Sequence, residues 1–92
     1  MTLTIGDTNR AGTLEITDTA WDSNGTMRVT VRELFGDHCW ALPRAQQERA
    51  VRDFARRAIS HPEKTRSARI TRRWFAESTD HWTVAVSRLA HA

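Results

Sequence analysis

Cysteine, long apolar runs and targeting signals are scarce or missing in this sequence. With Cys39 as its single cysteine, the chain cannot build an internal disulfide framework. This suits a reducing compartment, or a thiol that links two copies. No stretch approaches the roughly 18 apolar residues that span a bilayer, and residues 1–7 carry neither a basic leader nor a long apolar run. We therefore expect a cytoplasmic protein that makes no contact with a membrane.

Motifs for catalysis and metal binding are also missing. The sequence contains no nucleotide-binding loop, nucleophile elbow or paired-carboxylate motif. Its histidines and cysteine lack the short repeated spacings of metal ligands. We therefore expect no catalytic residue, no metal and no cofactor. A general acid–base role for His38, His61 or His81, as in a small ribonuclease toxin, is the third-ranked hypothesis.

The size of the chain predicts one domain. Its 92 residues lie near the lower limit for folding on a single core, and 39% of them are hydrophobic. Four tryptophans add large buried areas, enough for one sheet covered by one helix. We place the domain at residues 13–92. Residues 1–12 are expected to form either a flexible arm or a short edge strand through Leu3 and Ile5.

A period of two over residues 13–17 and again over 26–32 predicts two strands with their apolar side chains on one face. Asn24-Gly25 lies between them and is a strong hairpin signal, because both residues tolerate positive φ. A further reversal predicts a short third strand at 38–42. The inward residues of the first two strands are expected to be Leu14, Ile16, Met27, Val29 and Val31.

Pro43 marks a change of period. A proline at the first helical position loses no hydrogen bond, since that N–H has no partner in a helix. Residues 44–60 carry apolar side chains at spacings of three and four and stop before His61-Pro62, which predicts an amphipathic helix. Its narrow apolar stripe predicts that it lies on one face of a sheet with its other side in water.

Alternation returns in the last third of the chain and predicts two more strands. Trp74 is expected to face the core with Ala68 and Ile70, and Trp82 to do so in the final strand. Arg72 interrupts the apolar side, so a register shift or a bulge is expected there. The predicted fold is α+β: an antiparallel β-sheet in the element order β-β-β-α-β-β, with one amphipathic helix packed on one face.

Thirteen of the fourteen lysine and arginine residues are arginine, and they are concentrated in one part of the chain. Residues 44–73 hold ten cations and three anions, a net charge of +7, whereas residues 1–43 carry −3 and residues 74–92 carry −1. Arginine offers a rigid fork to carboxylates and phosphates, and it stacks on planar groups. The charge distribution therefore predicts an acidic or planar binding partner.

The first candidate site is a ridge on the predicted helix, formed by Arg49, Arg52 and Arg56. These residues lie three and four positions apart, so their side chains form one basic stripe. The stripe suits a phosphate backbone or an acidic protein groove. It would also be ordinary as a solvated helix face, since Glu48 and Asp53 neutralise part of it.

The second candidate is the sheet face turned away from the helix. Its predicted arginines are Arg28, Arg32, Arg69 and Arg73. Basic sheet faces bind nucleic acid in several folds. A solvated sheet is also commonly rich in arginine and threonine, and Glu15 can pair with an arginine of the next strand. We expect no aromatic pair of the RNA-recognition type on this face.

The four tryptophans divide into two groups. Trp40, Trp74 and Trp82 are expected in the core, where large aromatic side chains contribute most. Trp21 stands beside the predicted turn and is a candidate binding anchor, because tryptophan and arginine dominate interface hot spots.

In size and element order the whole chain resembles the small phage-encoded anti-CRISPR inhibitors. Those proteins are often single cytoplasmic domains built on one antiparallel sheet with one or two helices. The resemblance implies a non-enzymatic inhibitor that binds a Cas effector or surveillance complex stoichiometrically. Many such inhibitors are acidic and imitate DNA, whereas the basic helix expected here favours an acidic protein surface or an exposed guide RNA.

Two binding hypotheses therefore lead. In the first, the chain is an inhibitor whose helix ridge grips an acidic protein or ribonucleoprotein. In the alternative, it is a nucleic-acid-binding module that uses the ridge or the sheet face. Either protein is expected to be a monomer or a homodimer.

Overall fold

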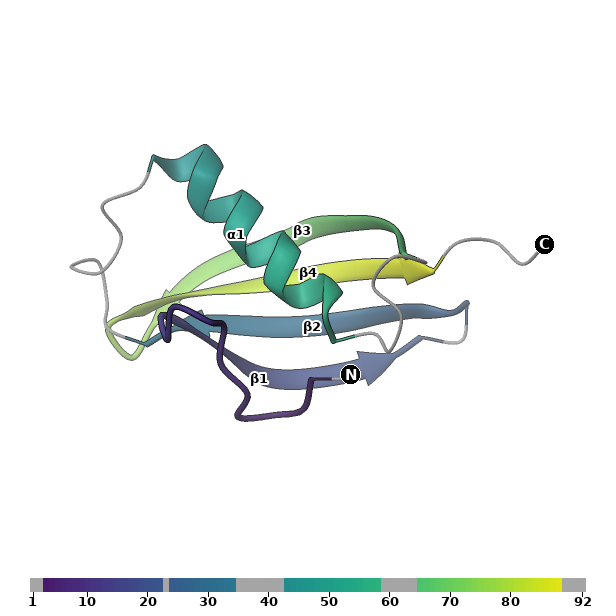
Figure 1. Ribbon diagram of the computed structural model, residues 1–92, viewed down its shortest axis with the longest axis horizontal. Coiled ribbons are helices and arrows are strands. Elements are labelled where there is room, and N and C mark those ends of the chain that lie inside the picture. Colours follow the sequence, from purple (N-terminus) through teal and green to yellow (C-terminus); the bar gives the residue numbers. More distant parts are fainter. Residues whose placement is uncertain (1–2, 23, 35–42, 59–64, 89–92) are drawn as a thin grey trace.

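The computed structural model describes residues 3–22, 24–34, 43–58 and 65–88, with the backbone alone at residues 65, 66 and 88. Within them, the chain forms two β-hairpins separated by a helix (Figure 1). The elements are β1 (Leu14–Trp21), β2 (Thr26–Glu33), α1 (Arg44–Arg56), β3 (Thr65–Ala76) and β4 (Thr79–Arg88). The third strand expected at 38–42 lies outside the described residues.

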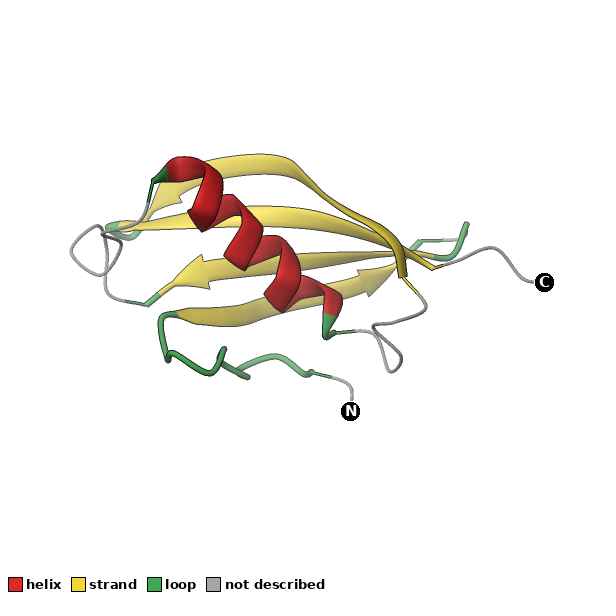
Figure 2. Cartoon of the chain, turned by 45° about the horizontal axis from the view of Figure 1, so that its top comes forward, coloured by secondary structure: helices red, strands yellow, loops and turns green. Residues whose placement is uncertain are grey.

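The four strands form one antiparallel sheet in the order β1-β2-β4-β3. The helix α1 crosses one face of this sheet and contacts β2, β4 and β3 (Figure 2). In the described part of the chain no helix or strand covers the opposite face, which we call the open face. The predicted α+β fold, an antiparallel sheet with one helix on one face, is therefore confirmed.

The β1–β2 hairpin forms where Asn24-Gly25 predicted it. Gly25 has φ of 84°, a conformation that costs glycine little. Its N–H donates to the Asp22 carbonyl oxygen at 3.2 Å, and the Asp22 N–H donates to the Thr26 carbonyl oxygen at 2.7 Å. The register brings Leu14 and Ile16 of β1 and the apolar residues of β2 to the same face, as predicted, and it shifts by one residue between Ile16 and Asp18.

The segment before β1 lies along the free edge of that strand. The Gly6 N–H donates to the Ile16 carbonyl oxygen at 2.8 Å, and the Ile16 N–H donates to the Asp7 carbonyl oxygen at 2.9 Å. Thr8 forms an isolated antiparallel bridge with Glu15. These bonds use edge groups of β1 that would otherwise be open to pairing with another chain.

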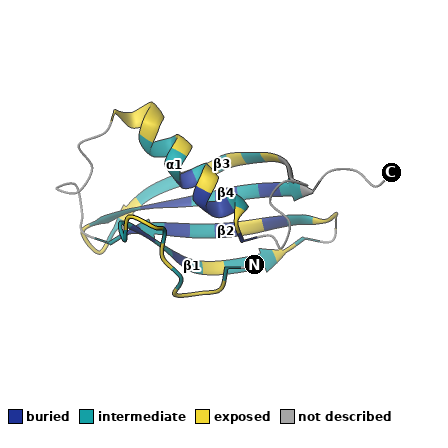
Figure 3. Cartoon of the chain, viewed as in Figure 1, coloured by how far each residue is buried: buried dark blue, intermediate teal, exposed yellow. Residues whose placement is uncertain are grey.

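The core lies between α1 and the sheet (Figure 3). Trp82 at its centre is fully buried, as expected for the final strand. The helix contributes its second half, whereas residues 43–46 at its start are exposed. The buried hydrophobic residues of the sheet and the helix are Leu14, Ile16, Met27, Val29, Val31, Val51, Phe54, Ala55, Ala58, Trp82, Val84 and Val86.

A β-bulge in β3 corrects two of the predicted side-chain directions. Up to Ile70, which pairs with Val84, the register follows the alternation, but it shifts by one residue before Arg72. Beyond the shift Arg73 pairs with Trp82 on the helix side, and Trp74 pairs with His81 on the open face. The irregularity expected at Arg72 is confirmed, but the predictions that Trp74 faces the core and Arg73 the open face are wrong. An extra residue in one strand reverses every later side chain.

The β3–β4 hairpin closes through Glu77 and Ser78, which have φ of 53° and 64°. Two-residue turns with positive φ normally use Asn-Gly or a similar pair, because a Cβ is crowded in this conformation. The Thr79 hydroxyl donates to the Ala76 carbonyl oxygen at 3.2 Å and helps to hold the turn. The sequence offers no turn signal at these two positions, and the turn is correspondingly strained.

Candidate functional site

One row of four side chains crosses the open face, with one residue from each strand. Glu15 of β1 pairs with Arg32 of β2, and Arg32 pairs with His81 of β4. His81 in turn pairs with Trp74 of β3. Directly paired residues of antiparallel strands share a face, so the sheet itself assembles this row.

The β3 end of the row is a stack of planar groups. The Trp74 and His81 rings lie 5.2 Å apart between centroids and 19° from parallel. The guanidinium carbon of Arg72 lies 4.6 Å from the centre of the Trp74 ring. Arg72 is exposed and Trp74 is half-buried, whereas His81 is only 8% exposed. The stack therefore presents Arg72 and Trp74 to a partner, with His81 as their support.

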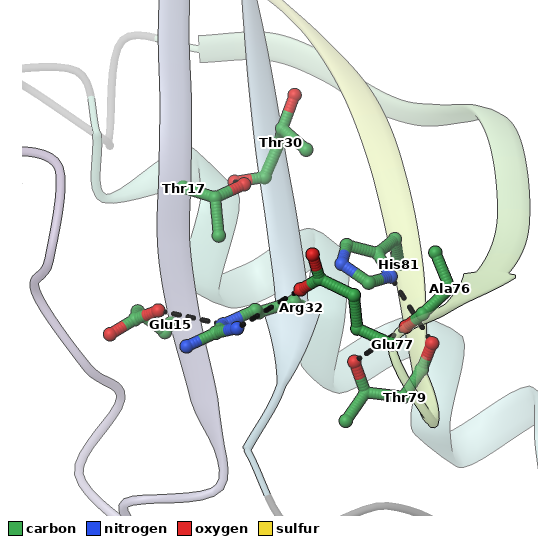
Figure 4. Close-up of polar contacts among 8 residues, drawn as sticks. All are labelled: Glu15, Thr17, Thr30, Arg32, Ala76, Glu77, Thr79 and His81. Carbon is green, nitrogen blue, oxygen red and sulfur yellow. Dashed lines mark hydrogen bonds and ion pairs between the residues drawn. The ribbon is translucent and has the colours of Figure 1, made fainter.

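A backbone contact orients the His81 ring. Its Nδ1 lies 3.1 Å from the Thr79 carbonyl oxygen, which can only accept, so Nδ1–H is the donor (Figure 4). The β3–β4 hairpin thus also fixes the orientation of the His81 ring, on which the Trp74 ring stacks. The ring is 8% exposed and supports the Trp74 ring by stacking.

Arg32 occupies the middle of the row and has a carboxylate on each side (Figure 4). Its Nε donates to Oε1 of Glu15 at 2.8 Å, and its Nη1 lies 4.0 Å from Oε2 of Glu77. The Glu15 side chain is 23% exposed and that of Glu77 is 80% exposed. The first contact is short and sheltered, and the second is long and open to water.

The arginines of the open face stand on two strands, β2 and β3, with β4 between them. The open-face residues of β4 beyond His81 are short, namely Thr83 and Ala85. Two strand spacings separate the arginine rows by about 10 Å. Arg69 and Arg72 on β3 are exposed. Among the residues whose side chains the structure describes, the open-face arginines are Arg28, Arg32, Arg69 and Arg72.

Acidic side chains reduce the net positive charge of the open face on the side of β1. Arg28 Nε lies 3.3 Å from Oδ1 of Asp22, and Asp18 is exposed opposite Thr30. The β3 side of the face, with Arg69 and Arg72, is therefore its more positive part.

The helix ridge lies on the other side of the molecule. Arg49 is exposed and Arg52 and Arg56 are half-buried, on the side of α1 away from the buried Val51, Phe54 and Ala55. The sheet and core separate this ridge from the open face (Figures 1 and 2). A flat partner cannot contact both basic surfaces at once, so they are two separate candidate sites.

Arg73 is predicted on the open face, but its side chain lies on the helix side, where it contacts Asp80 and Trp82. Its Nη2 lies 2.9 Å from Oδ2 of Asp80, and its guanidinium carbon lies 5.8 Å from the centre of the Trp82 ring. The Asp80 N–H donates to Oε1 of Glu33 at 3.1 Å. Glu33 is 1% exposed on the core side of β2, where it continues the inward face of Met27, Val29 and Val31.

Two exposed aromatic residues lie apart from the stack. Trp21 is 47% exposed at the end of β1, beside the hairpin as predicted, but it pairs with Met27 at the opposite end of the sheet from Trp74. Phe75 is 63% exposed in β3, on the same side as Arg73. Neither belongs to the row on the open face.

Sequence reasoning missed Arg72 as a site residue, placed Trp74 in the core, and considered His81 only as a general acid–base candidate. The signal that pointed to them was Arg72 itself, a charged residue at an apolar position of the alternation. A bulge at that position turns the next tryptophan outward, and a histidine in the facing strand then becomes its neighbour.

Comparison with known proteins adds no family. No protein-family model, curated protein or solved structure matches the chain. Among the described residues, no helix is long and apolar enough to cross a membrane. Among those same residues, no three histidine, cysteine, aspartate or glutamate side chains are grouped to hold a metal ion. His38, Cys39, Trp40 and His61 lie outside the described part of the chain.

Proposed function

We propose that this domain binds single-stranded nucleic acid through its open face. The observation that carries the proposal is the stack of Arg72, Trp74 and His81 on a sheet face that bears three further arginines. Aromatic rings and guanidinium planes on a sheet are the groups on which unpaired bases stack. The surrounding arginines supply contacts to the phosphates.

The proposal favours single strands over duplexes for a geometric reason. A base inside a duplex is stacked on its neighbours and cannot place its ring against Trp74. The short side chains of β4 between the two arginine rows also suit a strand that lies flat along the sheet. The finding that Trp74 and His81 share the open face removes the objection that this face has no aromatic pair.

Fluorescence anisotropy tests the proposal with labelled single-stranded DNA, single-stranded RNA and duplex DNA. Stacking of a base on an aromatic side chain contributes about 1–3 kcal/mol, so Trp74→Ala should weaken single-strand binding roughly fivefold to a hundredfold. Trp74→Phe should retain most of the affinity. Arg49→Ala, on the other side of the molecule, is the matched control and should change it little. Equal binding by wild type and Trp74→Ala, both folded by circular dichroism, would contradict the proposal.

A second candidate function rests on the helix ridge. Arg49, Arg52 and Arg56 project from the side of α1 away from the sheet, where an acidic protein can reach them. We propose as the second function that the chain is a phage-encoded inhibitor of a bacterial defence complex, with this ridge as its contact surface. A variant with all three ridge arginines changed to glutamate should lose such a protein complex while keeping oligonucleotide binding. The reverse result would assign nucleic acid to the ridge.

A further inference from the structure

We propose that Arg32 is the phosphate-binding centre of the open face and that Glu77 is an internal competitor, which a phosphate group displaces. This inference rests on the proposed function, because it names where the backbone of the bound strand is held. Arg32 lies in the same row as Trp74, two strands away and about 10 Å across the sheet. A strand whose base stacks at Trp74 therefore has a backbone phosphate within reach of Arg32.

The two carboxylates beside Arg32 have different roles. Glu15 binds Nε at 2.8 Å from the neighbouring strand and is mostly sheltered, so it fixes the position of the guanidinium. Glu77 approaches Nη1 only to 4.0 Å, with 80% of its side chain exposed. An exposed pair at this distance is weak and screened by salt. Arg32 is thus held on one edge, and its other edge is occupied by a group that is easily replaced.

The chemistry of the ligand follows from the edge of Arg32 that Glu77 occupies. A guanidinium binds phosphate through two parallel N–H donors, whereas Glu77 contacts it through one oxygen at the limit of an ion pair. A phosphate diester oxygen pair can therefore satisfy Arg32 better than Glu77 does. The carboxylate of Glu77 then turns into solvent without any change in the sheet.

The conformation of the turn that carries Glu77 is a second observation, independent of the ion-pair distances. Glu77 and Ser78 both have positive φ, in a turn that would be less strained with asparagine and glycine. The turn places a long acidic side chain at the end of the open face, beside the row formed by Glu15, Arg32, His81 and Trp74. Asparagine in place of Glu77 would relieve strain but would not bring a carboxylate to Arg32.

Glu77→Gln tests the inference by removing the charge while keeping the side-chain length. Single-strand affinity should rise roughly three- to fivefold, the upper part of the range that corresponds to a surface ion pair. Asp18→Asn removes the same charge from the same face at a residue that pairs with Thr30 and forms no ion pair with Arg32, and should raise affinity less than twofold. The gain from Glu77→Gln should disappear in an Arg32→Ala background, because the competition acts through Arg32.

A second measurement separates this inference from the proposed function. Inorganic phosphate is titrated into the wild type and Glu77→Gln, with the Arg32 Nε–Hε resonance followed by nuclear magnetic resonance. The resonance should shift at lower phosphate concentration in Glu77→Gln. Equal affinity gains in Glu77→Gln and Asp18→Asn, or equal phosphate titrations, would overturn the role of Glu77. If neither the wild type nor any variant binds an oligonucleotide, the proposed function fails. The phosphate titration then decides by itself whether Arg32 binds an anion in competition with Glu77.

Discussion

Trp74 faces His81 across β3 and β4, with ring centroids 5.2 Å apart, because a bulge between Ile70 and Arg72 turns the Trp74 side chain to the open face, where His81 already lies. Without the extra residue, Trp74 would lie on the helix side and Arg73 on the open face. A shift of one residue in the register of β3 thus decides whether the open face carries arginines alone or an aromatic stack with arginines around it.

The two tryptophans of the second hairpin should contribute very differently to stability. Trp82 is fully buried in the core and Trp74 is half-buried on the open face. Trp82→Ala should therefore lower the free energy of unfolding by about 3–5 kcal/mol, the usual range for a buried aromatic residue. Trp74→Ala should lower it by about 1 kcal/mol, since less apolar area is lost. Urea denaturation followed by circular dichroism measures both, and equal losses would contradict the assigned register.

The strained β3–β4 turn should be open to stabilisation. Ser78→Gly places the residue that tolerates φ of 64° best at this position. We expect the free energy of unfolding to rise by about 0.5–1 kcal/mol, because the relieved strain exceeds the added entropy of the unfolded chain. Gly25→Ala, at φ of 84° in the other hairpin, should lower it by about 1 kcal/mol. Urea midpoints that move in the same direction in both variants would contradict this account.

The Arg73–Asp80 ion pair should matter more than the Arg28–Asp22 pair. Its atoms lie 2.9 Å apart, with 28% and 19% of the two side chains exposed. The Arg28–Asp22 pair spans 3.3 Å, with 60% and 36% exposed. Double-mutant cycles with alanine should give a coupling of about 1–2 kcal/mol for the first pair and below about 0.5 kcal/mol for the second. A larger coupling for the exposed pair would show that Arg73 is not a structural residue.

The salt dependence of single-strand affinity should show how many arginines of the open face bind phosphate. Each neutralised phosphate of a single strand contributes a slope of about −0.7 to a plot of log affinity against log salt. The three arginines around the stack, Arg28, Arg32 and Arg69, therefore predict a slope near −2. Arg69→Ala should reduce its magnitude by about 0.7, and Arg49→Ala on α1 should leave it unchanged. Anisotropy titrations at several salt concentrations provide the slopes, and a slope that depends on Arg49 but not on Arg69 would move the site to the helix.

Local sequence signals predicted the helix and the strands, but they did not predict the turn of the β3–β4 hairpin. Asn24-Gly25 determines the first turn by its own conformational preference, and the three-and-four spacing after Pro43 determines the helix. Glu77-Ser78 carries no such preference, and the two long strands that pair on either side hold this turn in place. Burial of Glu33 likewise depends on its neighbour Asp80, which is distant in sequence.

The sequence by itself thus determined the α+β class, the inward faces of the first hairpin and the concentration of arginine, since these depend on residue type and short-range spacing. Tertiary structure decided which arginines share a surface. The position of the bulge depends on how β3 fits against β4, since two residues of one strand oppose one residue of the other. That fit adds Trp74 to the row of Glu15, Arg32 and His81, so that four strands contribute one residue each, an arrangement that no local pattern in the sequence contains.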